Sequence, residues 1–133
     1  MKLQDIEGVG EAYAAKLGAV GIGTVGALLE VCALPRARAT VAERTGISEK
    51  LILEWANHAD LMRIGGVGSE YADLLEEAGV DTVPELAHRS AANLHEKLKA
   101  VNGVRRLVRR LPSVRLLEGW IAEAKVLPRI LTY

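Results

Sequence analysis

The chain has 133 residues, of which 50% are hydrophobic but only 4% aromatic, so its apolar side chains are chiefly Ala, Val and Leu. A chain of this length buries roughly 65–70% of the surface of its unfolded form, which is enough for one core or two small ones. The 17 Lys and Arg residues equal the 17 Asp and Glu residues in number, which excludes a net charge that would by itself attract a polyanion.

Short helices are predicted throughout the first half of the chain. Thr24 and Ser48 are residue types that cap helix N-termini, and Pro35 suits a first helical turn. The expected helices cover residues 11–19, about 25–31, 35–45, and the stretch after Ser48 in which Leu51, Trp55, Ala59 and Met62 recur at three- and four-residue spacing.

The second half repeats the first. One pattern occurs twice, 58 residues apart, as Leu3-x-x-Ile6-x-Gly8-Val9-Gly10-x-x-Tyr13 and Leu61-x-x-Ile64-x-Gly66-Val67-Gly68-x-x-Tyr71. The segment from Thr82 to Glu85 is predicted to form a capping box, in which each side chain bonds the backbone N–H of the other residue. Ser113 is expected to start the final helix, where Trp120 is the counterpart of Trp55.

The two tryptophans are 65 residues apart rather than 58, so the second unit has about seven extra residues, located between Leu94 and Leu111. No Gly-, Ser- or Pro-rich linker separates the halves. We therefore expect an all-α fold of about ten short helices in two packed units, residues 1–60 and residues 61–133.

Each Gly-Val-Gly segment is predicted to be a tight turn between two helices. Glycine permits positive φ and close backbone approach, and Val9 or Val67 is expected to fill the space between the helices. Such a turn leaves the first N–H groups of the next helix unpaired, and this makes the helix start a ready anion site.

These turns, together with Lys16-Leu17, Gly21-Ile22-Gly23-Thr24 and the segment Ala42 to Lys50, resemble those of helix-hairpin-helix proteins. Each half is similar to the double-hairpin domain at the N-terminus of archaeal and eukaryotic RecA-like recombinases. The whole chain resembles a bacterial family of paired units with no assigned function. The resemblance implies two tandem helix-hairpin-helix (SAM-like) units, whose hairpins bind either a nucleic-acid backbone or another protein.

The sequence departs from this family after the second glycine, where a phosphate-binding hairpin carries Lys or Arg. Gly10 is followed by Glu11, and Gly68 by Ser69-Glu70, with further acids on the same predicted helix. Acids stabilise a helix start through the helix dipole but repel a phosphodiester. Two interpretations stay open: the turns only connect helices, or they contact phosphate through Gly8, Val9, Gly10, Gly66, Val67 and Gly68.

Positive charge is concentrated in the second half. Residues 88–115 contain eight basic residues and one acid, whereas residues 69–85 contain six acids and no base. The segment from Val104 to Leu111 is predicted to be a helix with four arginines on one side and Val or Leu on the other. The candidate partner-binding residues are Lys97, Lys99, Arg105, Arg106, Arg109, Arg110 and Arg115.

Three interpretations of this arginine surface stay open. It is a solvated face or one neutralised by acids of its own chain, a contact for an acidic protein surface, or a contact for a nucleic-acid backbone, since guanidinium groups suit carboxylates and phosphates equally. Only binding to nucleic acid predicts a steep loss of affinity with salt.

No motif for catalysis, a cofactor or a metal stands out. Gly8-x-Gly10-x-x-Tyr13 differs from a dinucleotide fingerprint because Tyr replaces the third glycine and no strand precedes it. His58, His88 and His95 lie on different segments without ligand spacing, and the single Cys32 is expected to be a buried thiol. We expect no enzyme, no cofactor, no metal site and no small-molecule substrate. With no leader and no membrane-spanning run, a cytoplasmic protein is expected.

The leading hypothesis is a non-catalytic interaction module, a protein-binding adaptor or assembly element that binds an acidic protein surface or a second copy. The alternative is non-sequence-specific binding of DNA or RNA through the predicted arginine helix and the hairpin turn amides. Protein assembly predicts arginines facing carboxylates across an interface. Nucleic-acid binding predicts an open arginine patch beside a hairpin.

Overall fold

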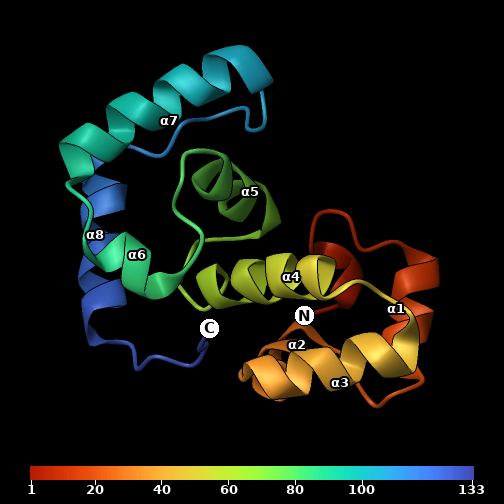
Figure 1. Ribbon diagram of the computed structural model, residues 1–133. Coiled ribbons are helices and arrows are strands. Elements are labelled where there is room, and N and C mark those ends of the chain that lie inside the picture. Colours follow the sequence, from red (N-terminus) through yellow and green to blue (C-terminus); the bar gives the residue numbers. More distant parts are fainter. The chain divides into compact units, whose positions relative to one another are not determined.

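The computed structural model describes residues 1–133 and contains eight α-helices, one short 3₁₀-helix and no strand. The prediction of an all-α fold of packed short helices is therefore confirmed (Figure 1). Two compact units divide the chain: unit 1 is Met1–Asp60 together with Ile130–Tyr133, and unit 2 is Leu61–Arg129. None of the helices combines the length and the apolar composition needed to cross a membrane.

Unit 1 begins with a 3₁₀-helix at Leu3–Asp5, followed by α1 (Glu11–Gly18), α2 (Val25–Val31), α3 (Pro35–Thr45) and α4 (Glu49–Leu61). The predicted caps are confirmed: Thr24 Oγ1 accepts a hydrogen bond from the Ala27 N–H at 3.1 Å, and Ser48 Oγ accepts one from the Leu51 N–H at 3.2 Å. Helix α3 ends at Gly46, which has φ 76°, a left-handed conformation that glycine adopts readily.

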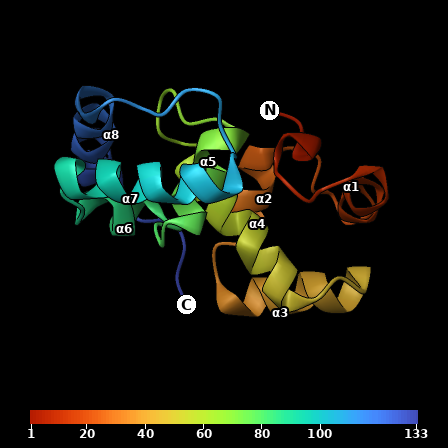
Figure 2. The same cartoon turned by 90° about the horizontal axis from the view of Figure 1, so that it is seen from above.

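Unit 2 contains α5 (Ser69–Glu77), α6 (Val83–Ala87), α7 (Ala91–Arg105) and α8 (Val114–Val126). Helix α8 packs against both α6 and α7, and α7 packs against α5 (Figures 1 and 2). Only one of the two bonds of the predicted capping box forms at the start of α6, and the prediction of the other bond is wrong. Thr82 Oγ1 accepts from the Glu85 N–H at 3.4 Å, but the Glu85 carboxylate bonds Arg89 at 2.7 Å instead of turning back to the cap.

The repeated aromatic residues occupy equivalent places in the two cores. The Tyr13 ring lies 5.0 Å from the Trp55 ring in unit 1, and the Tyr71 ring lies 5.3 Å from the Trp120 ring in unit 2. Val9 and Val67, the central residues of the two Gly-Val-Gly turns, are buried as predicted. Burial of these repeated positions explains why the two halves share their apolar pattern.

The predicted helix from Val104 to Leu111 is wrong. Helix α7 ends at Arg105, Arg106 takes a left-handed conformation with φ 51°, and residues 106–113 form a loop. The physical reason is Asn102, whose side chain donates to Val108 O at 3.1 Å and accepts from Val108 N at 3.0 Å. Val108 is thereby drawn into the core at 9% exposure, while Val104 stays 83% exposed.

The extra residues of the second half lie where they were predicted. Helix α7 has 15 residues where α3 has 11, and the loop after α7 covers residues 106–113 where the loop after α3 covers only residues 46–48. The basic segment is thus a longer helix followed by a longer loop.

The last four residues return to unit 1. The buried Arg38 guanidinium donates to Thr132 O at 2.7 Å and to the carbonyls of Cys32 and Ala33 at 3.0 Å each. Tyr133 Oη donates to Asn57 Oδ1 at 3.0 Å. These bonds satisfy a buried charge with backbone carbonyls and fix the chain terminus to unit 1.

Candidate functional site

The loop of residues 106–113, here called the arginine loop, is held against unit 2 at two points. Asn102 bonds both backbone groups of Val108, in the way that one β-strand residue pairs with another. Tyr71 Oη donates to Arg110 O at 3.0 Å. Because these bonds engage the backbone, the arginine side chains of the loop are left to point outward.

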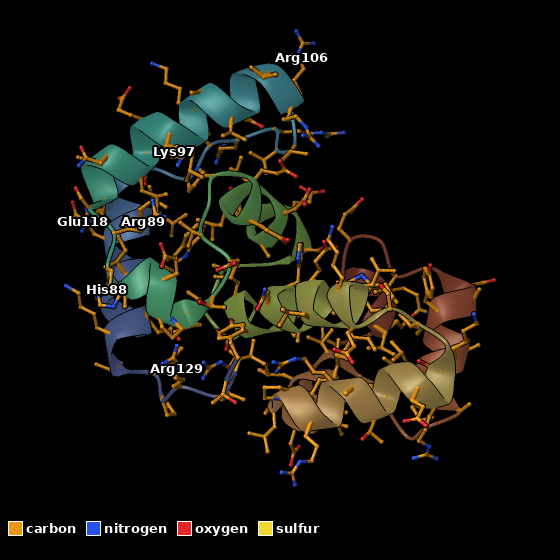
Figure 3. All side chains as sticks on the ribbon, in the orientation of Figure 1. His88, Arg89, Lys97, Arg106, Glu118 and Arg129 are labelled. Carbon is orange, nitrogen blue, oxygen red and sulfur yellow. The ribbon has the colours of Figure 1, made fainter.

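A cleft of about 770 Å³ lies between this loop and the start of α5. Arg106, Arg109 and Arg110 line one side, and Glu70 and Tyr71 line the other. Figure 3 shows Arg106 at the C-terminal end of α7, with its side chain directed away from the helix. The cleft thus combines three cationic side chains with the first turn of a helix.

The three arginines of the cleft have no carboxylate partner in the chain. Arg106, Arg109 and Arg110 are exposed, and their guanidinium groups form no ion pair. Arg105 differs, because it pairs with Glu77 Oε2 at 3.3 Å across the gap between α7 and α5. The predicted four-arginine face is therefore divided into one paired and three unpaired residues.

The acids of α5 reduce the charge of the cleft less than the sequence suggested. Glu77 is used by Arg105, and Asp73 and Glu76 are half-buried and engaged in other interactions. Glu70 is the acid of this helix that lines the cleft. The lining residues of the cleft thus include three arginines and one carboxylate, which gives it a net positive formal charge.

The Gly66-Val67-Gly68 turn lies directly before this helix. Gly66 has φ 89°, and a Cβ there would come within 3.4 Å of the buried Trp120 Nε1. Gly68 is the N-cap of α5 and supplies no side-chain hydrogen bond. The first N–H groups of α5 therefore have no side-chain cap, the condition under which a helix start binds an anion.

A second cleft, of about 530 Å³, includes Gly65, the residue directly before the same turn. Gly65, Trp120 and Arg115 are among its lining residues. The Gly65 N–H donates to Glu123 Oε1 at 3.0 Å, which anchors the turn to α8. Arginines therefore lie at both ends of the turn: Arg115 beside Gly65, and the arginine loop beside Glu70.

The equivalent turn of unit 1 has the same backbone but not the same surroundings. Gly8 has φ 91°, and Gly10 is the N-cap of α1 without a side-chain bond. Glu11 follows, and the short loop after α3 carries no basic residue at positions 46–48. The two turns are alike in geometry and different in charge.

The remaining candidate residues lie away from the cleft. Lys97 and Lys99 are exposed on α7, and Lys97 Nζ is near Gly79 rather than near the arginine loop. Figure 3 shows Lys97 in the middle of α7 and Arg106 at its end. The structure therefore brings together Arg106, Arg109 and Arg110 in one cleft, and neither lysine lines it.

Asn102 and Tyr71 are the two residues of this site that sequence reasoning missed. Tyr71 packs on Trp120 as Tyr13 packs on Trp55, but its hydroxyl also holds the arginine loop. The Asn102-Gly103 pair is the one local signal for the end of α7, because Gly is unfavourable inside a helix.

The titratable groups do not add a chemical centre to this site. No group of three or more His, Cys, Asp or Glu residues is placed to hold a metal ion. Burial raises the pKa of Cys32 to about 11, with a smaller opposing effect from Arg38, so this thiol is protonated at neutral pH. Burial also raises the pKa of Asp81, which does not line the cleft.

No curated protein and no solved structure matches the chain. A family model matches residues 7–127, and these residues include the whole arginine loop and both Gly-Val-Gly turns. The match covers far more than half of the chain, so the protein belongs to the family described as a domain of unknown function (DUF4332).

Proposed function

We propose that this protein is a non-catalytic binding module and that unit 2 binds the phosphate backbone of a nucleic acid without reading its sequence. One observation carries the proposal. Arg106, Arg109 and Arg110, exposed and without carboxylate partners, line one cleft with the first turn of α5, directly after the Gly66-Val67-Gly68 turn. Guanidinium groups and helix-start amides are both phosphate ligands.

The proposal includes the inference that each unit is built from helix-hairpin-helix elements. Hairpins of that type bind phosphate with turn amides and a basic residue just after the second glycine. Here Ser69 and Glu70 occupy those positions. We infer that the arginine loop supplies the missing positive charge from a distant part of the chain, since Arg109 and Arg110 line the same cleft as Glu70.

Contacts to phosphate rather than to bases are favoured by the aromatic residues. Tyr71 is the aromatic side chain of the cleft, and it is half-buried against Trp120 with its hydroxyl bonded to Arg110 O. Its packing on Trp120 and its bond to the loop backbone restrict the use of this ring for stacking a base. The expected binding is therefore electrostatic and tolerant of sequence.

A second candidate is an acidic protein surface, including one on another copy of this chain. The Arg105–Glu77 pair, at 3.3 Å, supports this candidate because an arginine of this region binds a carboxylate there. Tyr and Arg are also residue types that protein interfaces favour. We rank it second because the three cleft arginines adjoin a helix start, which suits a compact anion such as phosphate.

The test measures fluorescence anisotropy of labelled random-sequence 20-mers, as single-stranded DNA, duplex DNA and single-stranded RNA, over a range of KCl concentrations. If three or four arginines each neutralise one phosphate, the log–log slope on duplex DNA is about −2.7 to −3.6. Affinity then falls roughly 40- to 150-fold between about 50 and 200 mM salt. Absence of binding to all three probes at the lowest salt would overturn the proposal.

A matched pair of variants tests the site. Arg109→Glu with Arg110→Glu is expected to abolish binding, whereas Arg36→Glu with Arg44→Glu, the same charge change on α3 of unit 1, keeps most of it. Equal losses in both variants would mean that net charge and not the cleft drives binding. Polyglutamate that competes as strongly as the nucleic acid would instead favour an acidic protein partner.

A further inference from the structure

We propose that a groove on unit 1 is the docking site for a short amphipathic helix of a partner protein, with carboxylates flanking its apolar side chains. The proposal is independent of nucleic-acid binding, which concerns unit 2. It rests on a groove of about 340 Å³ between α2, α3 and the segment after α1, whose larger aliphatic side chains are Val20, Val31, Leu34 and Val41.

Two of the apolar side chains of this groove are exposed to solvent. Val31 is 42% exposed and Leu34 is 56% exposed, and both lie at the junction of α2 and α3. Two neighbouring large aliphatic residues that stay in solvent form a surface that a partner can bury. Leu34 is also the N-cap of α3, where it makes no side-chain capping bond, so its side chain has no role in capping that helix.

The second unit provides an internal comparison. Gly21 and Gly79 are equivalent glycines, with φ 85° and 91°, that follow α1 and α5. A Cβ on Gly79 would come within 3.6 Å of Lys97 Nζ and 3.7 Å of Arg89 Nη2, whereas a Cβ on Gly21 would meet nothing within 4 Å.

In unit 2 this region is therefore covered by polar side chains, and Arg89 is held there by Glu85 at 2.7 Å and by Gly79 O at 3.1 Å. In unit 1 no such side chain lies beside Gly21, and the adjoining groove is lined mainly by aliphatic residues. Since the repeated fold does not itself require the groove to be open and apolar, the difference points to a separate use in unit 1.

The groove sets the length and charge of its occupant. Ala37, Thr40, Val41 and Arg44 lie on one face of α3, and the lining extends along this helix from Arg36 to Arg44, a distance of about 12 Å. Two helical turns of a partner fit this length, with apolar side chains three or four residues apart.

Arg36 and Arg44 are exposed, form no ion pair in the chain and are the charged residues of the groove. No carboxylate lines it. An apolar floor with a cation toward each end selects a helix whose apolar residues are flanked by Asp or Glu, because a basic helix would meet like charge.

The experiment selects binders from a displayed library of random 16-residue peptides against the whole protein, with Leu34→Lys protein as the competing target. Enriched peptides are expected to carry two apolar residues at three- or four-residue spacing with acids on either side. Their binding should shift the NMR signals of Val20, Val31 and Val41. Leu34→Lys should weaken the affinity roughly 10-fold or more.

Two further variants make the result specific. Val126→Lys changes a valine of unit 2 that is 80% exposed, and it should leave peptide affinity unchanged. Arg36→Glu with Arg44→Glu should invert the selection toward basic peptides. The proposal is overturned if no peptide distinguishes the wild type from Leu34→Lys, or if the selected peptides show no charge preference. A wild-type dimer in sedimentation equilibrium that Leu34→Lys dissociates would also overturn it, because the occupant would then be a second copy of this chain.

Discussion

Replacing Asn102 with Ala should release the arginine loop while leaving every charge in place. The Asn102 amide makes both bonds that hold Val108, one as donor at 3.1 Å and one as acceptor at 3.0 Å. Val108 is also buried, at 9% exposure, as is Pro112 near the end of the loop. Asn102 therefore holds the middle of the loop, and the Tyr71 hydroxyl holds it separately at Arg110 O.

The size of the effect follows from these two bonds. A hydrogen bond between neutral groups contributes about 1 kcal/mol to stability, so the loss of both is worth about 2 kcal/mol of local opening free energy. Because about 1.4 kcal/mol corresponds to a factor of ten, hydrogen exchange of the Val108 amide should become roughly 30-fold faster.

Native-state hydrogen exchange followed by NMR measures this change residue by residue. Asn93→Ala is the matched control, since Asn93 is on the same helix with an exposed side chain that makes no hydrogen bond. That variant should exchange like the wild type at Val108. If Asn102→Ala also leaves Val108 exchange unchanged, the loop is held by its apolar contacts and the reasoning is refuted.

Three further predictions concern the frame around the site. Gly66→Ser should destabilise unit 2 by about 1–2 kcal/mol in urea unfolding, because φ at Gly66 is 89°. Gly68→Ser, at an N-cap with open space around it, should instead stabilise unit 2 by a few tenths of a kcal/mol. Equal effects of the two variants would contradict the different backbone conformations of these glycines. Burial raises the pKa of Cys32 to about 11 in the folded protein. The thiol of the unfolded chain therefore ionises first, and the free energy of unfolding should fall between about pH 9 and pH 11. Cys32→Ala should lack this part of the pH dependence when unfolding is compared at the two ends of that range. Arg38→Met removes three hydrogen bonds to carbonyls and should lower the free energy of unfolding by at least about 3 kcal/mol. NMR relaxation should show residues 130–133 becoming mobile. Unchanged relaxation would show that other contacts hold the terminus.

Local signals in the sequence were reliable where the structure uses local bonds. Thr24 and Ser48 cap the helices they were expected to cap, through hydroxyls that reach a backbone N–H three residues away. Helix α3 ends at Thr45, as expected, and Gly46 follows it in a left-handed conformation. Such bonds join neighbours in the chain, so the residue types and their spacing are enough to predict them.

Two predictions failed because a competing partner was present. The Glu85 carboxylate was expected to return to the start of α6, but Arg89, one turn away, offers a charged donor and takes it. The arginine helix was expected to continue past Arg105, but Asn102 binds Val108 and turns the chain. In both cases the residue pattern was compatible with the predicted structure, but a specific side-chain bond favoured a different structure.

The repeat, the helical class and the positions of most caps were contained in the sequence, because periodicity, glycine and capping chemistry act over a few residues. Which arginines are unpaired was decided only by the tertiary structure. Arg105 meets Glu77, 28 residues earlier in the chain, while Arg109 and Arg110 lie with Glu70 around one cleft. Charges distant in sequence interact through space, and their separation depends on how the helices pack and where the loop between α7 and α8 turns.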